Sequence, residues 1–193
     1  MANANAPTGL SPVRYLSGAP YNGACNRYYV PSGDGTAIYV GGLVKPGGTA
    51  DANGVMSVTG NVATGNPVVG VVVAVEPVTR DSTIHRAAST ERYVWVADDP
   101  NLLFKVQEDS VGGALAVTAV GNSADLTGFT SGSATTGLSS IQIDSNTATA
   151  SGDGTEDVVV FGLANTPDNA IGDYAKWLVR LNNHFYVDGS AGA

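Results

Sequence analysis

The stretch that decides the fold is Val68-Val69-Gly70-Val71-Val72-Val73-Ala74-Val75. Every position in it is apolar or glycine, so both faces of an extended chain are apolar here. Such a strand is expected at the centre of the structure, buried on both sides. Pro77 is expected to end it, because proline cannot donate a ladder hydrogen bond. A strand covered on both faces needs a sandwich or a closed barrel around it.

β-Branched runs alternate with turn signals along the rest of the chain, which is the pattern of short strands. Residues 111–120 have the one composition that suits a helix, although Gly112 and Gly113 weaken it. Residues 121–154 are expected to form exposed loops, and Trp177 and Phe185 are expected to be large core residues. The strands are predicted at residues 36–40, 55–58, 92–97, 102–106, 141–143, 157–163 and 176–181.

The predicted fold class is therefore all-β. We expect a single β-barrel or jelly-roll-like sandwich with at most one short helix, formed by residues 36–193. The 25 glycines among 193 residues support many turns and few helices.

Residues 1–35 are predicted to form an extended N-terminal arm. Four prolines and five glycines in this segment prevent a helix and permit only short extended pieces. The segment also carries four tyrosines and Leu16, and a solvated linker would have little use for so many large apolar side chains. We expect the arm to lie on its own body, on a sister subunit or on another protein.

Charge and cysteine content exclude several classes of protein. The net charge is −8, from 9 basic and 17 acidic residues, so no nucleic-acid partner is expected. Cys25 is the single cysteine, which rules out an intrachain disulfide. The sequence has no apolar run long enough for a membrane span, and its first residues do not resemble a secretory signal. A product made in the cytoplasm is expected.

The sequence contains none of the common catalytic motifs, so no enzyme activity, catalytic residue or cofactor is expected. His85 and His184 stand far apart and are interpreted as strand-end or surface residues, not as metal ligands. Residues 144–157 are rich in oxygen-bearing side chains but lack the spacing of a calcium loop, so solvated turns are favoured over calcium binding. The adjacent acids Asp98-Asp99 and Glu108-Asp109 would point to opposite faces of a strand, which does not suit a pair of glycosidase carboxylates.

The arm carries the candidate site. Tyrosine and arginine are common anchors of protein interfaces, because both are large and can make a polar contact at one end. The alternative is that the tyrosines simply pack on the body. The residues predicted at an interface with a sister subunit or another protein are Arg14, Tyr15, Leu16, Tyr21, Arg27, Tyr28 and Tyr29.

Four phrases of the sequence resemble a family of small decoration, or cement, proteins of tailed-bacteriophage heads. They are PVRYLSGAPYNG at residues 12–23, RYYVP at 27–31, FKVQED at 104–109 and AKWLVRLNNH at 175–184. The resemblance implies a structural virion protein on the capsid exterior that binds the major capsid protein, often as a trimer. It carries over no catalytic residue.

Three other classes of protein were considered. A major capsid protein would need a long spine helix that this sequence cannot supply. A carbohydrate- or receptor-binding module of a virion is compatible with an all-β fold, and it would predict aromatic residues on the loops of the body. An enzyme such as a lysin would need a converging set of catalytic side chains, which the sequence does not suggest.

Overall fold

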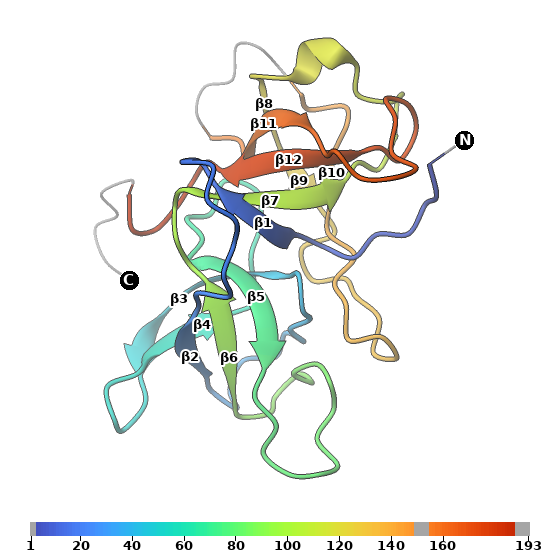
Figure 1. Cartoon of the computed structure of the whole chain (residues 1–193). Helices are drawn as coiled ribbons and strands as arrows, with labels where there is room; N and C mark the ends of the chain where they lie inside the picture. Colours follow the sequence, from blue (N-terminus) through green and yellow to red (C-terminus); the bar gives the residue numbers. More distant parts are fainter. Residues whose placement is uncertain (1–2, 149–154, 188–193) are drawn as a thin grey trace.

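The computed structural model describes residues 3–148 and 155–187. It is all-β and contains a closed barrel, as predicted, and its described part holds one single-turn 3-10 helix, Val117–Ala119, within the predicted helical segment. Figure 1 shows a lower half formed by the barrel and an upper half formed by a five-stranded sheet. The two halves are stacked on each other.

The barrel closes in the order β2-β4-β3-β5-β6. Its interior is a cluster of valines with Ile38 and Tyr28, and Phe185 packs against it from the end of the chain. Alternation along each strand sends every second side chain into this interior. The strands are β2 (Asn26–Val30), β3 (Leu43–Ala50), β4 (Met56–Thr59), β5 (Gly70–Val75) and β6 (Arg92–Ala97).

The upper sheet is antiparallel throughout and has the order β1-β7-β12-β11-β8. A second layer, β9 (Leu126–Thr127) paired with β10 (Gln142–Ile143), covers its inner face. Trp177 is fully buried between the layers, as expected for a large core residue. The strands of the sheet are β1 (Ser11–Tyr15), β7 (Leu102–Gln107), β12 (Lys176–Leu181), β11 (Val158–Leu163) and β8 (Ser123–Ala124).

The valine-rich stretch lies between the two halves, which explains why it is apolar on both faces. Val69 and Val72 belong to the core of the barrel, whereas Val68 and Val71 belong to the core of the upper half. At Gly70 a Cβ atom would lie 2.3 Å from the carbonyl oxygen of Ala97, so only glycine fits at this crossing. One strand therefore contributes to two cores.

Residues 36–40 form isolated bridges at Ile38 and Val40 in place of the predicted strand. The chain turns immediately afterwards at Gly41, whose φ of 83° ends the extended run. Residues 43–50, for which no strand was predicted, form β3, with an irregular register after Pro46.

The segment predicted as an arm enters both halves of its own chain. β1 pairs with β7 at the edge of the upper sheet, and β2 pairs with β6 in the barrel. The division into an arm of residues 1–35 and a body of residues 36–193 stays a prediction. What the structure adds is that both strands of this segment hydrogen-bond to strands of the same chain.

Candidate functional site

The seven predicted interface residues lie in four places. Strand β2 alternates, so Tyr28 points into the barrel while Arg27 and Tyr29 point outward. Tyr28 is 5% exposed, and its hydroxyl lies 2.6 Å from Asp98 Oδ2 and 2.7 Å from the hydroxyl of Tyr186. Burial, and then the bond to Asp98, raises the pKa of Tyr28. Tyr28 thus packs inside the barrel and hydrogen-bonds to Tyr186 near the C-terminus.

Tyr15 and Tyr21 are half-buried and pack against the core of the upper half. Tyr21 also lines a hollow of about 420 Å³ between the halves, together with Leu10 and Val73. Burial raises the pKa of Tyr21. These two tyrosines therefore join the two halves more than they present a free surface.

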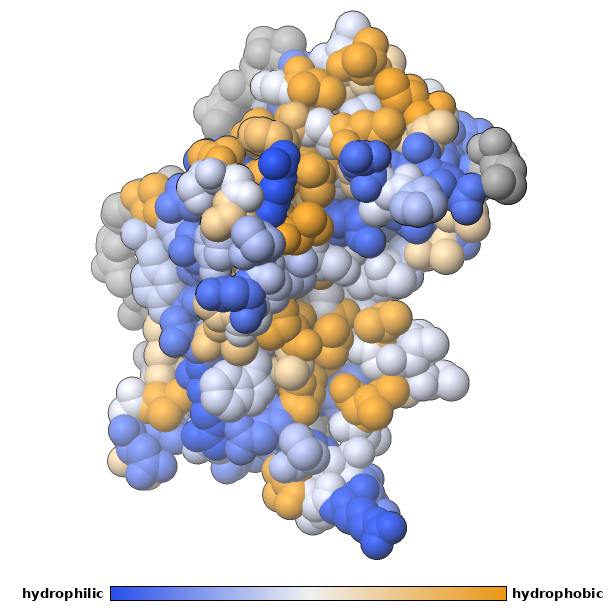
Figure 2. Space-filling view, viewed as in Figure 1, coloured by the Kyte–Doolittle hydropathy of each residue, from blue (hydrophilic) through white to orange (hydrophobic). Residues whose placement is uncertain are grey.

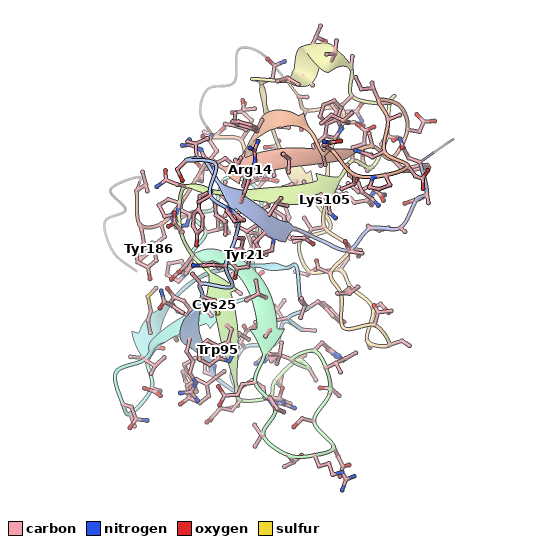
Figure 3. All side chains as sticks on the ribbon, viewed as in Figure 1. Arg14, Tyr21, Cys25, Trp95, Lys105 and Tyr186 are labelled. Atoms are coloured by element: carbon pink, nitrogen blue, oxygen red, sulfur yellow. The ribbon has the colours of Figure 1, made fainter. Side chains whose placement is uncertain are left out.

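Arg27 and Tyr29 lie on the outside of the barrel beside two residues of β6. Cross-strand pairing places Arg27 opposite Trp95 and Tyr29 opposite Tyr93. The guanidinium carbon of Arg27 is 3.5 Å from the centre of the Tyr93 ring, and the ring of Tyr29 is 5.5 Å from the same ring. We call these four residues the barrel face; Trp95 is labelled in Figure 3.

Acidic residues hold the barrel face in place. Arg27 donates two hydrogen bonds to Glu76, at 2.8 and 2.9 Å, which lowers the pKa of that carboxyl. The hydroxyl of Tyr93 donates to Asp51 at 2.6 Å. This bond and the backbone N–H of Val55 lower the pKa of Asp51 to about 2. Arg27 and Tyr93 are therefore each fixed by a carboxylate as well as by each other.

Arg14 and Leu16 lie in a different place, on the outer surface of the upper sheet. Strand β12 alternates there, with Trp177 and Val179 buried and with Leu178 and Arg180 on the outer side. We call this surface the sheet face, and in Figures 2 and 3 it is the upper front of the molecule, where Arg14 is labelled. Its members are Val13, Arg14, Leu16, Lys105, Phe161, Lys176, Leu178 and Arg180.

The sheet face combines cationic and apolar side chains. Arg14 and Arg180 both pair with Leu103, so the three share one row across the sheet. The guanidinium carbon of Arg14 lies 5.4 Å from the centre of the Phe161 ring. Figure 2 shows apolar residues interrupted by hydrophilic ones over this sheet.

Two hollows lie in the sheet face. One of about 430 Å³ is lined by Val13, Arg14 and Lys105 of the sheet and by residues 163–166. The other, of about 260 Å³, is lined by Leu16, residues 159–161 and Arg180, among others. No carboxylate lines either hollow.

Sequence reasoning missed Tyr93, Trp95, Lys105, Phe161 and Arg180. The alternation of charged and apolar residues in 176–181 was a signal that Arg180 points outward. The other four become neighbours of Arg14 or Arg27 only through the pairing of β1 with β7, β7 with β12 and β2 with β6. That pairing joins residues far apart in the sequence, and no local pattern reports it.

Neither histidine lies on either face. His85 is 8% exposed and stacks on Tyr39 with ring centres 4.9 Å apart, and His184 is 2% exposed beside Val68. In the described residues, no group of three or more histidine, cysteine, aspartate or glutamate side chains is arranged to hold a metal ion. Among the same residues, no helix has the length and apolar character needed to cross a membrane.

Two of the acidic residues discussed in the sequence analysis, Glu108 and Asp144, form hydrogen bonds within the fold. Glu108 is fully buried and accepts the N–H of Leu115 at 2.7 Å, and burial raises its pKa. Asp144 accepts the N–H of Asn146 in a turn. Residues 149–154 of the oxygen-rich segment lie outside the described residues.

No protein family, no curated protein and no solved structure matches the chain. The geometry of the two faces and the quoted phrases of the sequence are therefore the basis for a proposal about function.

Proposed function

We propose that this chain is a structural, non-catalytic virion protein that binds the outer surface of a tailed-phage head and stabilises the capsid lattice. Its partner would be the major capsid protein, and it would act as a homo-oligomer, with a trimer favoured. The proposal rests on the sequence phrases quoted above and on one structural observation, the barrel face. Neither a cofactor nor a nucleic acid is part of it.

The barrel face has the composition of an interface hot spot. Tryptophan, tyrosine and arginine contribute most of the binding energy in protein interfaces, and all three types meet here. The ion pair of Arg27 with Glu76 and its stacking on Tyr93 hold the arginine in one conformation before any partner arrives. Less conformational entropy is then lost on binding, which favours affinity. Arg27 and Tyr29, two of the residues predicted at an interface, belong to this face.

The role of a cement protein also fits repeated weak contacts. Each copy would need only modest affinity, since several linked copies on a symmetric shell bind collectively. A small, stiff contact surface on every protomer is enough for this purpose.

Co-sedimentation of the purified chain with phage heads that lack it tests the proposal. We expect saturable pelleting at a fixed ratio to the capsid subunit. Trp95→Ala and Tyr93→Ala should each weaken binding by about tenfold or more, the range of a hot-spot residue. Val78→Ala is the matched control, because Val78 is 70% exposed and is not one of the four residues of the barrel face. An absence of pelleting, or equal loss in all three variants, would count against the proposal.

A carbohydrate- or receptor-binding module is the second candidate. The half-buried aromatic rings of the barrel face could stack on a sugar ring, and the carboxylates of Glu76 and Asp51 beside them could accept hydrogen bonds from its hydroxyls. A glycan-binding screen distinguishes the two candidates. Saturable binding of one glycan, lost in Trp95→Ala and retained in Val78→Ala, would favour this second function.

A further inference from the structure

We infer that copies of this chain associate head to tail, with the sheet face of one copy bound to the acidic opposite side of the upper half of the next. The inference rests on the proposed function for its expectation of an oligomer. Its observations and its test concern the chain alone, independently of any capsid.

The sheet face holds cations that lack acidic partners. Arg14, Lys105, Lys176 and Arg180 form no ion pair within residues 3–148 and 155–187, and all four are partly buried. They are four of the nine basic residues, so the remaining five stand against seventeen acidic residues elsewhere in the chain. A surface whose cations have no acidic partner, on an acidic protein, is suited to a contact with negative charge.

Apolar side chains on the same surface favour a protein as the occupant. Leu16 is 46% exposed, Phe161 45% and Val13 38%, and the two hollows lie beside them. Protein interfaces combine apolar contact at the centre with charged residues at the rim. A phosphate backbone would use the cations but would leave these apolar side chains in water.

The opposite side of the upper half is acidic. The layer of β9 and β10 buries Leu126 and Ile143 against the core, so alternation directs the adjacent Asp125 and Asp144 away from it. Asp109 joins them through bonds of 3.1 and 3.0 Å from Ser145 to its Oδ1. In Figure 1 this layer lies behind the five-stranded sheet.

The side chains of Asp109, Asp125 and Asp144 are all partly exposed on this layer. The upper half has cations on its outer sheet and acids on its second layer, which makes it dipolar.

The placement of the cations and the acids on opposite sides of the upper half determines which faces of two copies can bind each other. Two cationic faces repel each other, so a two-fold contact of sheet face with sheet face is disfavoured. A contact between unlike faces is heterologous and repeats from copy to copy. Because the two faces point in opposite directions, two copies cannot satisfy both contacts at once. The assembly is then a ring of three or more copies if the rotation between copies closes, and an open chain if it does not.

Sedimentation velocity of the full chain over a range of concentrations tests the inference. We expect an oligomer of at least three copies that dissociates between about 50 mM and about 500 mM NaCl, because salt screens the contact. The double variant Arg14→Glu/Arg180→Glu should weaken association by about tenfold or more. Arg80→Glu, a single charge reversal on an exposed turn, should leave it intact, whereas Arg14→Glu and Arg180→Glu should each weaken it when made singly.

Variants of the acidic side provide an independent check. Asp109→Asn and Asp144→Asn retain an acceptor oxygen for their turn hydrogen bonds and remove the charge, so together they should also weaken association. Circular dichroism would confirm that each variant is folded. A monomer at every concentration, or a dimer strengthened by salt, would overturn the inference. Loss of capsid binding with association intact would instead count against the proposed function alone.

Discussion

Arg86 is the residue whose replacement gives the sharpest test of how the barrel is held together. Its guanidinium is fully buried at one end of the barrel, where it donates to the carbonyl oxygens of Thr90, Thr36 and Pro31 at 2.7, 2.6 and 2.8 Å. The carboxylate of Asp34 lies 3.9 Å away. Burial lowers the pKa of Arg86, and Asp34 opposes that shift. The Arg86 side chain thus links residues 31–36 to residues 86–90.

Arg86→Met retains most of the volume and removes all three hydrogen bonds. Each carbonyl left without a partner costs at least about 1 kcal/mol, and Asp34 loses its buried counter-ion. We therefore expect the free energy of unfolding to fall by about 3 to 5 kcal/mol, the range seen when one partner of a buried ionic contact is removed. Arg86→Lys should lose less, because an ammonium keeps the charge but cannot reach three divergent carbonyls.

Urea unfolding followed by tryptophan fluorescence measures this effect in the barrel. The chain has two tryptophans, Trp95 in the barrel and Trp177 in the upper sheet, so a Trp177→Phe background leaves a reporter in the barrel alone. Arg80→Met, an exposed arginine, is the matched control. A loss below about 1 kcal/mol in Arg86→Met would refute the reasoning, since it would mean that the three carbonyls find other partners.

Three further predictions concern buried side chains. Trp177→Ala should lower the free energy of unfolding by about 3 to 5 kcal/mol in a denaturant titration, because the ring is fully buried, and a near-neutral result would contradict that placement. Asp157 has its pKa raised by burial, so the folded chain holds this proton more tightly than the unfolded chain does. The stability that Asp157 contributes is then greatest below its pKa in the unfolded chain, about 4, and is lost as the pH rises through its pKa in the folded chain. Asp157→Asn should reduce this dependence of stability on pH, measured by thermal unfolding at a series of pH values. Tyr28→Phe removes the bond to Asp98 and should cost about 1 kcal/mol, measured by thermal unfolding, with Tyr29→Phe as the exposed-side control.

The strands with a clear period in sequence were predictable. Residues 92–97 and 176–181 form β6 and β12 with the predicted bounds, because their alternation corresponds to one buried and one outer face. The burial of the valine-rich stretch on both faces was predictable for residues 68–72, since no polar residue interrupts it, but Val73 and Val75 are half-buried and Ala74 is exposed. β3 was not, because Pro46 and its glycines suggest a turn and are tolerated only through an irregular register.

The candidate site was less predictable than the fold. Alternation separates neighbours in sequence, which is why Tyr28 is in the barrel core while Arg27 and Tyr29 are outside it. Conversely, pairing brings Trp95 beside Arg27 across a separation that no local pattern encodes. Single residues of an interface can thus be proposed from composition, but their grouping into faces depends on the register between strands.

The chain enters the barrel at β2 and leaves it at β6, and these two strands are neighbours. Asn26 near its start pairs with Val96 near its end, and the upper sheet resumes at β7 a few residues later. In topological terms the barrel is an insertion between β1 and β7, and its first and last strands, β2 and β6, pair with each other. Its hairpins can lengthen or shorten without displacing the strands of the sheet, because the two points of attachment stay adjacent. Insertions and deletions in the hairpins are therefore expected to change the surface of the barrel without changing the register of the upper sheet.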